Sequence, residues 1–323
     1  MQTKIGLDLG NYDLKTRNTV TPSSYAERTT KDLIAEESIF YNGLYYVPTL
    51  KRNNQQVDKT EGDYCLIMSL FGIAKELIAR LNARFPGYNE AQLQDEISKY
   101  TEISLGVGLP AGKFSSLARK MVDCYMNAWK DGCEFSYINK SEGEFKFNFK
   151  LINCKPFPQD YTAVAFNKRV ELPKGVNDYY IIGIGGGTVD IIPVNNTNVD
   201  TDQIMTFEKG TTVLYSQIIK RIQQETGKVM EYSTIESILR GENTIIRDER
   251  IDIIQREKAD FAKKLVDEIL HYGYQLSDRP CIFVGGGALL LKDALEANKE
   301  FAYTFFMDDV KANAYFFEAL LAS

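Results

Sequence analysis

The feature that most constrains this chain is the segment 181–192, where two runs of apolar, β-branched residues flank a triple glycine. The segment predicts a strand, a tight turn and a returning strand. Glycines lack a Cβ atom, so the three at 185–187 can bring backbone N–H groups close to a phosphate. Thr188 can add a hydroxyl and Asp190 a carboxylate for a metal ion or its waters. The alternative is an ordinary hairpin turn, which glycine-rich sequences also form.

A similar pattern stands near the N-terminus. The segment 5–9 predicts a short apolar strand that ends before Gly10-Asn11, and the segment 13–16 can return as a second strand. Laying residues 7–10 on residues 182–185 aligns a strand, a glycine turn and a strand in both copies. Such a repeat favours two similar lobes that face one nucleotide, with two unrelated hairpins as the alternative.

A third glycine turn follows the apolar strand predicted from 280 to 284. Its glycines stand at 285–287. A helix that starts near Leu289 would point its N-terminus at any ligand that binds beside these glycines. One glycine-rich turn is a weak signal, so the three turns together carry more weight than any of them alone.

Composition limits the classes of protein that the chain can belong to. Its 323 residues suffice for two domains, and a net charge of −6 argues against direct binding of nucleic acid by charge neutralisation. The five cysteines are odd in number and form no CxxC pair, so neither a zinc site nor a disulfide framework is indicated. His271 is the only histidine, which argues against histidine-rich metal sites, and we expect it at the surface or at a helix end.

The N-terminus enters a strand-like run directly, without the pattern of a signal peptide. No apolar segment reaches the length needed to span a membrane. These two observations predict a cytoplasmic protein.

Several further elements follow from periodicity and turn signals. Asn42-Gly43 predicts a hairpin between 37–41 and 44–47, and apolar spacing predicts helices over 63–81 and through Leu93 and Ile97. Two more strands are expected, over 103–109 and, with period-two alternation, over 145–151. A helix is expected over 117–129, capped by Ser115 or Ser116, and a short helix over 161–166 after a crossing at 156–160. Further helices are expected after Gly210, from Arg256, and at the end of the chain, where Asp308-Asp309 would cap the last one.

Three elements carry a resemblance: Asp8-x-Gly10-Asn11, then Gly185-Gly186-Gly187-Thr188-x-Asp190, then Gly285-Gly286-Gly287. In this order and at these spacings they resemble the phosphate-1, phosphate-2 and adenosine motifs of the actin superfamily, which also contains sugar kinases and the large heat-shock chaperones. Within the superfamily, the segment 107–110, the Pro158-Gln159 crossing and the segment 310–314 are similar to the ParM/StbA plasmid-segregation actins. The resemblance covers nearly the whole chain.

The resemblance implies an α/β, two-lobed, actin-like (ribonuclease H-like) fold with a nucleotide cleft between the lobes. Lobe I would span 1–160 with an inserted subdomain over about 22–100. Lobe II would span 161–302 with its own insertion over about 220–255. Residues 303–323 would form a C-terminal strand and a helix that returns to lobe I.

The resemblance also implies a role for each matching residue. Asp8 would order the waters of Mg²⁺, and Gln159 would orient the attacking water. The residues implied to contact nucleotide are Gly10, Asn11 and Lys15 on the first side, Gly185, Gly186, Gly187 and Thr188 on the second, and Gly285, Gly286 and Gly287 beneath the adenosine. Asp190 would support the loop or the metal, so Asp8, Gln159 and Asp190 form the implied catalytic set.

One position departs from the family pattern. The family usually has an aspartate that helps to hold magnesium and water where this chain has Gly183. We therefore expect nucleotide binding to be kept and hydrolysis to be kept but altered, with Asp160 or Asp190 as the candidates to replace the missing carboxylate.

The function that the resemblance implies is a filament that forms with Mg-ATP or Mg-GTP, hydrolyses the nucleotide and segregates plasmid DNA. Its partners would be copies of itself and an adaptor bound to centromere-like DNA, without a membrane. Leu44–Val47 is a candidate filament contact or, equally, ordinary strand core. The alternatives are a nucleotide-gated scaffold without turnover and a small-molecule kinase. A kinase needs a carboxylate base near the acceptor hydroxyl, and the loop after Leu105 offers none.

Overall fold

The computed structural model describes residues 1–31, 35–49, 59–242 and 245–321. The chain divides into two compact units, which are described separately. Unit 1 holds residues 1–166 and 311–323, and unit 2 holds residues 167–310.

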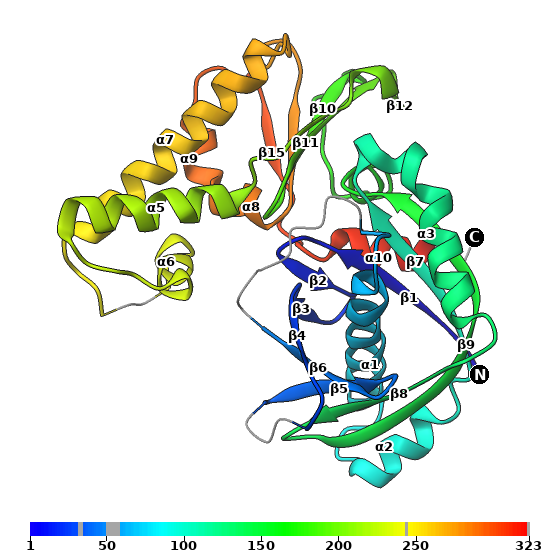
Figure 1. The fold of residues 1–323 in the computed structure, drawn as a ribbon. Helices are drawn as coiled ribbons and strands as arrows, with labels where there is room; N and C mark the ends of the chain where they lie inside the picture. Colours follow the sequence, from blue (N-terminus) through cyan, green and yellow to red (C-terminus); the bar gives the residue numbers. More distant parts are fainter. Residues whose placement is uncertain (32–34, 50–58, 243–244, 322–323) are drawn as a thin grey trace. The chain divides into compact units, whose positions relative to one another are not determined.

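Unit 1 is built on a nine-stranded sheet in the order β3-β2-β1-β7-β9-β8-β5-β6-β4 (Figure 1). Its strands are β1 Gln2–Leu9, β2 Asp13–Lys15, β3 Val20–Pro22, β4 Tyr25–Arg28, β5 Glu37–Tyr41, β6 Leu44–Pro48, β7 Glu102–Leu109, β8 Cys133–Asn139 and β9 Gly143–Pro158. β1 and β7 run parallel, as do β7 and the second half of β9. Their carboxyl ends therefore lie at one edge of the sheet, where ligands of α/β proteins usually bind.

The long strand β9 joins the two halves of this sheet. It pairs antiparallel with β8 through residues 143–149 and parallel with β7 through residues 150–158. Phe145, Phe147 and Phe149 are buried while the residues between them are exposed, which confirms the predicted period-two strand. The alternation ends because the register shifts beside Ile103 and leaves Ile152 on a bulge, 42% exposed.

The hairpin between β5 and β6 is confirmed. Asn42 and Gly43 both have positive φ, 48° and 80°, as a type I′ turn requires. β6 lies between β5 and β4, and Tyr46 is buried, so the segment Leu44–Val47 is an interior strand of the sheet. Parts of the predicted insertion over 22–100 lie outside the described residues.

The helices of unit 1 are α1 Tyr64–Arg84, α2 Glu90–Ile97, α3 Phe114–Trp129, α4 Tyr161–Ala165 and α10 Ala312–Leu320. α1 is buried on most of its circumference, because its sequence is apolar on nearly every face. α3 buries one narrow stripe with a spacing of four residues, Leu117, Met121, Tyr125 and Trp129, and packs on β9 and β7.

Two predicted helix caps are wrong. The N-cap of α3 is Lys113, so Ser115 and Ser116 lie inside the helix, because a 3-10 turn over Ala111–Lys113 runs directly into it. Ser116 instead donates its hydroxyl back to the carbonyl of Lys113 at 2.9 Å. α10 has Lys311 as its N-cap, two residues beyond the predicted pair Asp308-Asp309.

Unit 2 has a six-stranded sheet in the order β12-β11-β10-β14-β15, with β13 also paired to β11. Its strands are β10 Tyr179–Ile184, β11 Val189–Asn195, β12 Asn198–Val199, β13 Met205–Phe207, β14 Cys281–Val284 and β15 Thr304–Phe306. Its helices are α5 Thr211–Thr226, α6 Tyr232–Leu239, α7 Glu249–His271, α8 Gly286–Leu290 and α9 Lys292–Glu296.

Helices α5 and α7 pack against each other in unit 2 (Figure 1). Arg221 and Arg256 reach across this contact to carboxylates of the facing helix. α7 starts at Glu249 with Asp248 as its N-cap, seven residues before the predicted start at Arg256, because Asp248 accepts the N–H of Arg250. His271 is exposed at the last position of α7, as expected.

The internal repeat is confirmed by strand register. Leu9 pairs with Leu14 and Ile184 with Val189, so each hairpin closes over a turn of the same length. Each first strand also has a parallel neighbour, β7 for β1 and β14 for β10. In this alignment Asp8 corresponds to Gly183 in unit 2 and Lys15 corresponds to Asp190, because Asp8 faces Lys15 and Gly183 faces Asp190.

Candidate functional site

Asp8 is a buried carboxylate at the carboxyl end of β1, with 4% of its surface exposed. The side-chain amide of Gln159 donates to its Oδ1, and Nδ2 of Asn313 donates to its Oδ2 at 3.4 Å. Nζ of Lys15, on the facing strand β2, lies 3.9 Å from Oδ2. A buried charge needs such partners, and these three come from separate segments of the chain.

Gln159 follows β9 directly and is fixed at its backbone as well as at its side chain. Its N–H donates to the carbonyl of Leu109 at 2.8 Å. A Cβ atom at Gly108 would lie only 2.8 Å from Cγ of Gln159, so glycine at that position leaves room for the side chain. Nε2 of Gln159 donates to Asp8. Its Oε1 atom accepts no hydrogen bond from the described part of the chain, so it can accept one from water.

The first glycine turn brings Gly10 beside Lys15. A Cβ atom at Gly10 would lie 2.6 Å from the carbonyl oxygen of Asp13 and 3.5 Å from Nζ of Lys15. Asn11 is half-buried in the same turn. The turn therefore requires glycine at position 10 and lies within reach of one ammonium group.

Lys59 is a member of this region that sequence reasoning missed. It is 5% exposed, and its ammonium donates to the carbonyl of Leu9, directly before the first glycine turn. A lysine in a polar, irregular stretch gives no sequence signal of such a contact, because 50 residues separate the two groups.

The second glycine turn is held from behind by the N-terminus of α5. The carbonyls of Gly185, Gly186 and Gly187 accept the N–H groups of Thr211, Thr212 and Gly210 at 3.0, 2.9 and 3.0 Å, respectively. The contact is close enough that a Cβ atom at Gly210 would lie 2.3 Å from the Gly186 carbonyl oxygen.

The same turn leaves donors unpaired on its other side. Gly186 and Gly187 are both buried, and across the described ranges their N–H groups have no hydrogen-bond acceptor. Buried N–H groups without a partner are rare in folded proteins, because each one costs the free energy of a lost hydrogen bond. An anion placed against this turn would supply the missing acceptors.

Asp190 is 7% exposed and is bound by two hydroxyl groups. Oγ1 of Thr188 donates to its Oδ2 at 3.1 Å, and Oγ1 of Thr206 on β13 donates to its Oδ1 at 2.5 Å. The carboxylate thus fixes the end of the glycine turn to the neighbouring strand. Thr206 was not singled out from the sequence.

The third glycine element packs on the second inside unit 2. Gly285 has φ of +99°, and a Cβ atom there would lie 2.7 Å from the carbonyl oxygen of Ile184. A Cβ atom at Gly287 would lie 2.7 Å from side-chain carbons of Ile184 and Thr211. Gly286 is exposed, and α8 starts there, earlier than the predicted start near Leu289. The close contacts bring the two glycine elements together.

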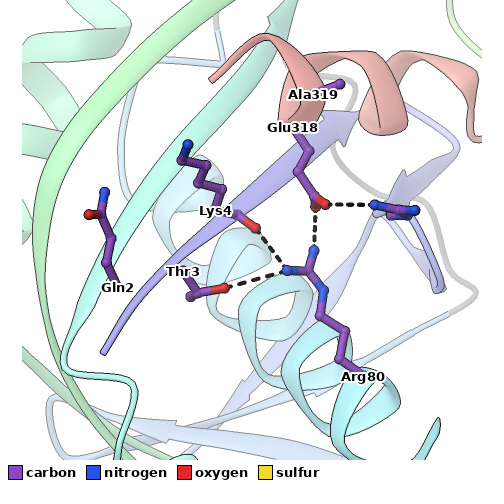
Figure 2. A pocket seen from close by; sticks show the side chains of 7 residues that line it. Gln2, Thr3, Lys4, Arg80, Glu318 and Ala319 are labelled. Atoms are coloured by element: carbon purple, nitrogen blue, oxygen red, sulfur yellow. Dashed lines mark hydrogen bonds and ion pairs between the residues drawn. The ribbon is translucent and has the colours of Figure 1, made fainter. Parts of the chain in front are cut away.

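A pocket of about 430 Å³ lies at the opposite end of β1 from Asp8 and contains none of the predicted site residues (Figure 2). Arg80 donates to the carbonyl of Lys4 at 2.9 Å and pairs with Glu318. Arg17 pairs with the same Glu318, so the carboxylate of this pocket is bound by two guanidinium groups. A larger pocket of about 1210 Å³ lies over β8 and β9 and also lacks the predicted residues.

Metal, thiol and membrane features are few in the part of the chain that the structure describes. No group of three or more His, Cys, Asp or Glu side chains there is arranged to hold a metal ion. All five cysteines are free thiols. Among the described helices, none combines the length and the apolarity that crossing a bilayer requires.

Comparison with known proteins places the fold. Residues 181–297, which include the second and third glycine elements, match the family model of the archaeal actin homologue MreB-like C-terminal domain. No curated protein matches the chain. The archaeal actin homolog Ta0583 in complex with ADP superposes with a TM-score of 0.72 at 15% identity, over 99% of both chains.

Two bacterial proteins have the same fold. A ParM from Clostridium botulinum, solved as a 15-stranded filament, superposes with a TM-score of 0.71 at 15% identity over 99% of both chains. The ParM of Bacillus thuringiensis with ATP gives a TM-score of 0.62 at 15% identity, over 98% of this chain and 97% of that one.

Proposed function

We propose that this chain, whose fold is that of the actin homologues, binds a nucleoside triphosphate with Mg²⁺ and assembles with copies of itself into filaments. The observation that carries the proposal is the pair of buried, unpaired N–H groups on the turn at Gly186 and Gly187. The fold and the resemblance to the actin superfamily, both inferred from the three glycine elements, are confirmed. ADP in Ta0583, ATP in one ParM and the filament of another support the proposal.

Each unit offers groups that would contact phosphate. In unit 2, Gly186 and Gly187 offer N–H groups on a turn that α5 holds rigid, so little is lost in ordering the donors. Thr188 donates its one hydroxyl hydrogen to Asp190, so its oxygen would accept a hydrogen bond from a water of the metal ion rather than donate to a phosphate. In unit 1, Gly10, Asn11 and Lys15 would contact the phosphates, with Lys15 as a point charge. Gly285, Gly286 and Gly287 would lie beneath the adenosine, where their missing side chains admit a flat base.

Asp8 would hold the Mg²⁺ ion through its waters. Magnesium usually keeps several waters and binds through one or two carboxylates together with phosphates, and here it would neutralise phosphate charge. The donor set fits this use, because Asp8 is an anionic acceptor within 4 Å of only one cation, Lys15, among the described residues.

Gln159 would orient the attacking water. Its Nε2 is anchored on Asp8, which leaves Oε1 as the acceptor for a water hydrogen. Phosphoryl transfer depends mainly on positioning and charge stabilisation, so an oriented water and fixed donors supply most of what the reaction needs. Asp190 supports this arrangement through Thr188 and Thr206.

The second candidate function is a scaffold that binds nucleotide and assembles without turnover. Gly183 favours it, because this residue occupies in unit 2 the place that Asp8 occupies in unit 1. Phosphate release measured on assembled protein separates the two functions. Intact triphosphate in stable filaments would support the scaffold, and steady release would support the ATPase.

We further propose that the filament segregates plasmid DNA through an adaptor bound to centromere-like DNA. The net charge of −6 makes direct binding of DNA by the filament unfavourable. A small-molecule kinase is less favoured, because the segment 108–113, which covers the end of β7 and the turn that follows it, contains no carboxylate to act as its base.

Light scattering tests the proposal directly. Addition of Mg-ATP or Mg-GTP to the purified protein should raise the scattering, and omission of nucleotide should leave it flat. Whichever nucleotide gives assembly at the lower protein concentration is the preferred one. Flat scattering with both nucleotides at high protein concentration would contradict the proposed assembly.

A further inference from the structure

We infer that Asn313 is a positioning residue that holds Asp8 and Gln159 in their working arrangement. The inference rests on the proposed function, because that function gives the pair its role. Asn313 lies in the first turn of α10 and is 8% exposed. It is separated from Asp8 by 305 positions and from Asp160 by 153, so sequence reasoning gave it no role.

A single side-chain amide makes three contacts. Oδ1 of Asn313 accepts the backbone N–H of Asp160 at 2.9 Å. Nδ2 donates to Oδ1 of Asp160 at 3.2 Å and to Oδ2 of Asp8 at 3.4 Å. An N–H group requires an acceptor and two carboxylates require donors, so the chemistry allows only one orientation of this amide.

The contact with Asp160 controls the backbone next to Gln159. Asp160 has φ of 62° and ψ of −49°, a conformation that residues other than glycine rarely adopt. Asn313 binds both the backbone and the side chain of Asp160 and so holds this turn. Gln159 is the preceding residue, and its direction toward Asp8 depends on the turn.

The contact with Asp8 completes the arrangement. Gln159 donates to one carboxylate oxygen and Asn313 donates to the other. Asp8 therefore has an amide on each side and cannot rotate without losing one of them. Asn313 acts on both members of the pair, on Asp8 directly and on Gln159 through Asp160.

Asn313 can impose this geometry because α10 is seated tightly on the sheet of unit 1. A Cβ atom at Gly6 would lie 1.9 Å from the carbonyl oxygen of Ala314, and one at Gly106 would lie 2.6 Å from that of Phe317. At its other end, α10 is anchored by Glu318, which pairs with Arg80 and Arg17 (Figure 2). The helix is thus a fixed support whose place does not depend on the pair that it orients.

Steady-state hydrolysis by Asn313→Ala and Glu318→Gln tests the inference. Both variants remove polar anchors of α10, but only Asn313 contacts Asp8 and Asp160. Asn313→Ala should lower kcat about tenfold and leave KM within about threefold, as expected for a residue that positions the reacting groups. Glu318→Gln should keep kcat. Equal losses of kcat in the two variants would mean that Asn313 only seats the helix, and would overturn the inference.

A second readout does not depend on turnover. The side-chain NH₂ resonances of Gln159, assigned by their loss in Gln159→Ala, report its hydrogen bond to Asp8. They should shift in Asn313→Ala and stay in place in Glu318→Gln. A shift without hydrolysis in the wild type would refute the proposed ATPase and leave the inference standing. Unshifted resonances in Asn313→Ala, with an active wild type, would refute the inference and leave the ATPase standing.

Discussion

Each oxygen of the buried carboxylate of Asp8 accepts a hydrogen bond from a different amide, and the nearest cation, Lys15, stands on the facing strand. In unit 2 the matching pair is Gly183 opposite Asp190, so the acid stands on the second strand and a glycine is its cross-strand partner. The two halves of the repeat have the same backbone but different chemistry. Single residues therefore decide what each half contributes.

Replacing Gln159 should separate binding from turnover. Gln159→Ala removes the Oε1 atom that would orient water and one donor to Asp8, so we expect the hydrolysis rate to fall about a hundredfold. Nucleotide affinity should stay within about threefold, because the phosphate donors are elsewhere. Phosphate release and equilibrium binding of a fluorescent nucleotide measure the two effects.

Gln94→Ala is the matched control for this experiment. Gln94 exchanges two hydrogen bonds with the backbone of Lys146, far along the chain from Asp8, so its loss should lower stability and leave the rate unchanged. A Gln159→Ala variant as active as Gln94→Ala would remove Gln159 from the reaction.

Restoring an acid at position 183 should increase turnover. Gly183→Asp places a carboxylate where the repeat has Asp8, and we expect phosphate release to rise about tenfold if the missing acid limits hydrolysis. The new carboxylate would face Asp190 across the hairpin, so the thermal midpoint should fall because like charges opposite each other repel. A folded variant that binds nucleotide and releases phosphate no faster would show that Gly183 is not the limiting residue.

At the level of elements, the second glycine turn and the N-terminus of α5 are joined by hydrogen bonds. Three carbonyls of the turn accept three N–H groups at the start of the helix, so the helix uses its orphan donors to hold the turn. The opposite side of the turn keeps its own donors for a ligand. The sequence predicted both the turn and the helix after Gly210, but it did not indicate that they bind each other.

A side chain at Gly210 should damage nucleotide binding through this contact. Gly210 has φ of −72°, which any residue can adopt, so Gly210→Val acts through the collision with the Gly186 carbonyl, 2.3 Å from the new Cβ, and not through backbone strain. We expect nucleotide affinity to fall at least about tenfold as the turn is displaced. Titration with a fluorescent nucleotide measures the change.

Gly227→Ala controls for loss of stability. Gly227 ends the same helix with φ of +68° and has open space around it, so alanine there should cost about 1 kcal/mol of unfolding free energy and leave affinity unchanged. Equal affinities for Gly210→Val and Gly227→Ala would contradict a role for the turn.

Glu76 ties α1 to the β2–β3 turn and should make stability depend on pH. Burial favours its neutral form, but hydrogen bonds from Thr16, Arg80 and the Asn18 N–H, with the charge of Arg80, outweigh burial and lower its pKa below the usual range of a glutamate. A pKa lowered by folding adds stability above the unfolded value, and this stability is lost as pH falls through the folded value.

Denaturant titrations of wild type and Glu76→Gln test this assignment. The substitution should cost about 1–3 kcal/mol at pH 7, because it removes the charge that Arg80 and the buried donors require. As pH falls below the ordinary pKa of a glutamate, the difference between the two proteins should shrink, because the unfolded wild-type chain then takes up a proton. The difference should be lost as pH falls through the lowered pKa of the folded protein. A difference that stays constant from pH 7 to pH 3 would contradict the lowered pKa.

At the level of the whole molecule, local pattern predicted most of the fold. Apolar runs, glycine turns and the Asn42-Gly43 hairpin are contained in short stretches, and the repeat emerged because two such stretches have the same length between strands. Helix starts were predicted less well. α3 continues a 3-10 turn and α7 is capped by Asp248, and neither feature follows from the apolar spacing of the helix itself.

The candidate site was predictable only where its residues sit inside a motif. Asp8, Gly10 and the glycines at 185–187 are such residues. Lys59 and Thr206 lie outside the motifs and reach the site from other elements. Asn313 falls in the segment 310–314 that carries part of the resemblance, but it reaches Asp8 across 305 positions. A single sequence does not show which distant residues contact each other. A residue can therefore belong to a recognisable motif while its hydrogen-bond partners cannot be predicted.

In the proposed function, nucleotide held at the second glycine turn drives assembly. Sedimentation of the wild type and of Gly210→Val, each with and without Mg-ATP, tests this coupling. The wild type should pellet as filaments only with nucleotide, and Gly210→Val should stay in the supernatant at an ATP concentration that saturates the wild type. If the wild type stays in the supernatant with ATP, or if both proteins pellet equally with and without it, the claim is contradicted.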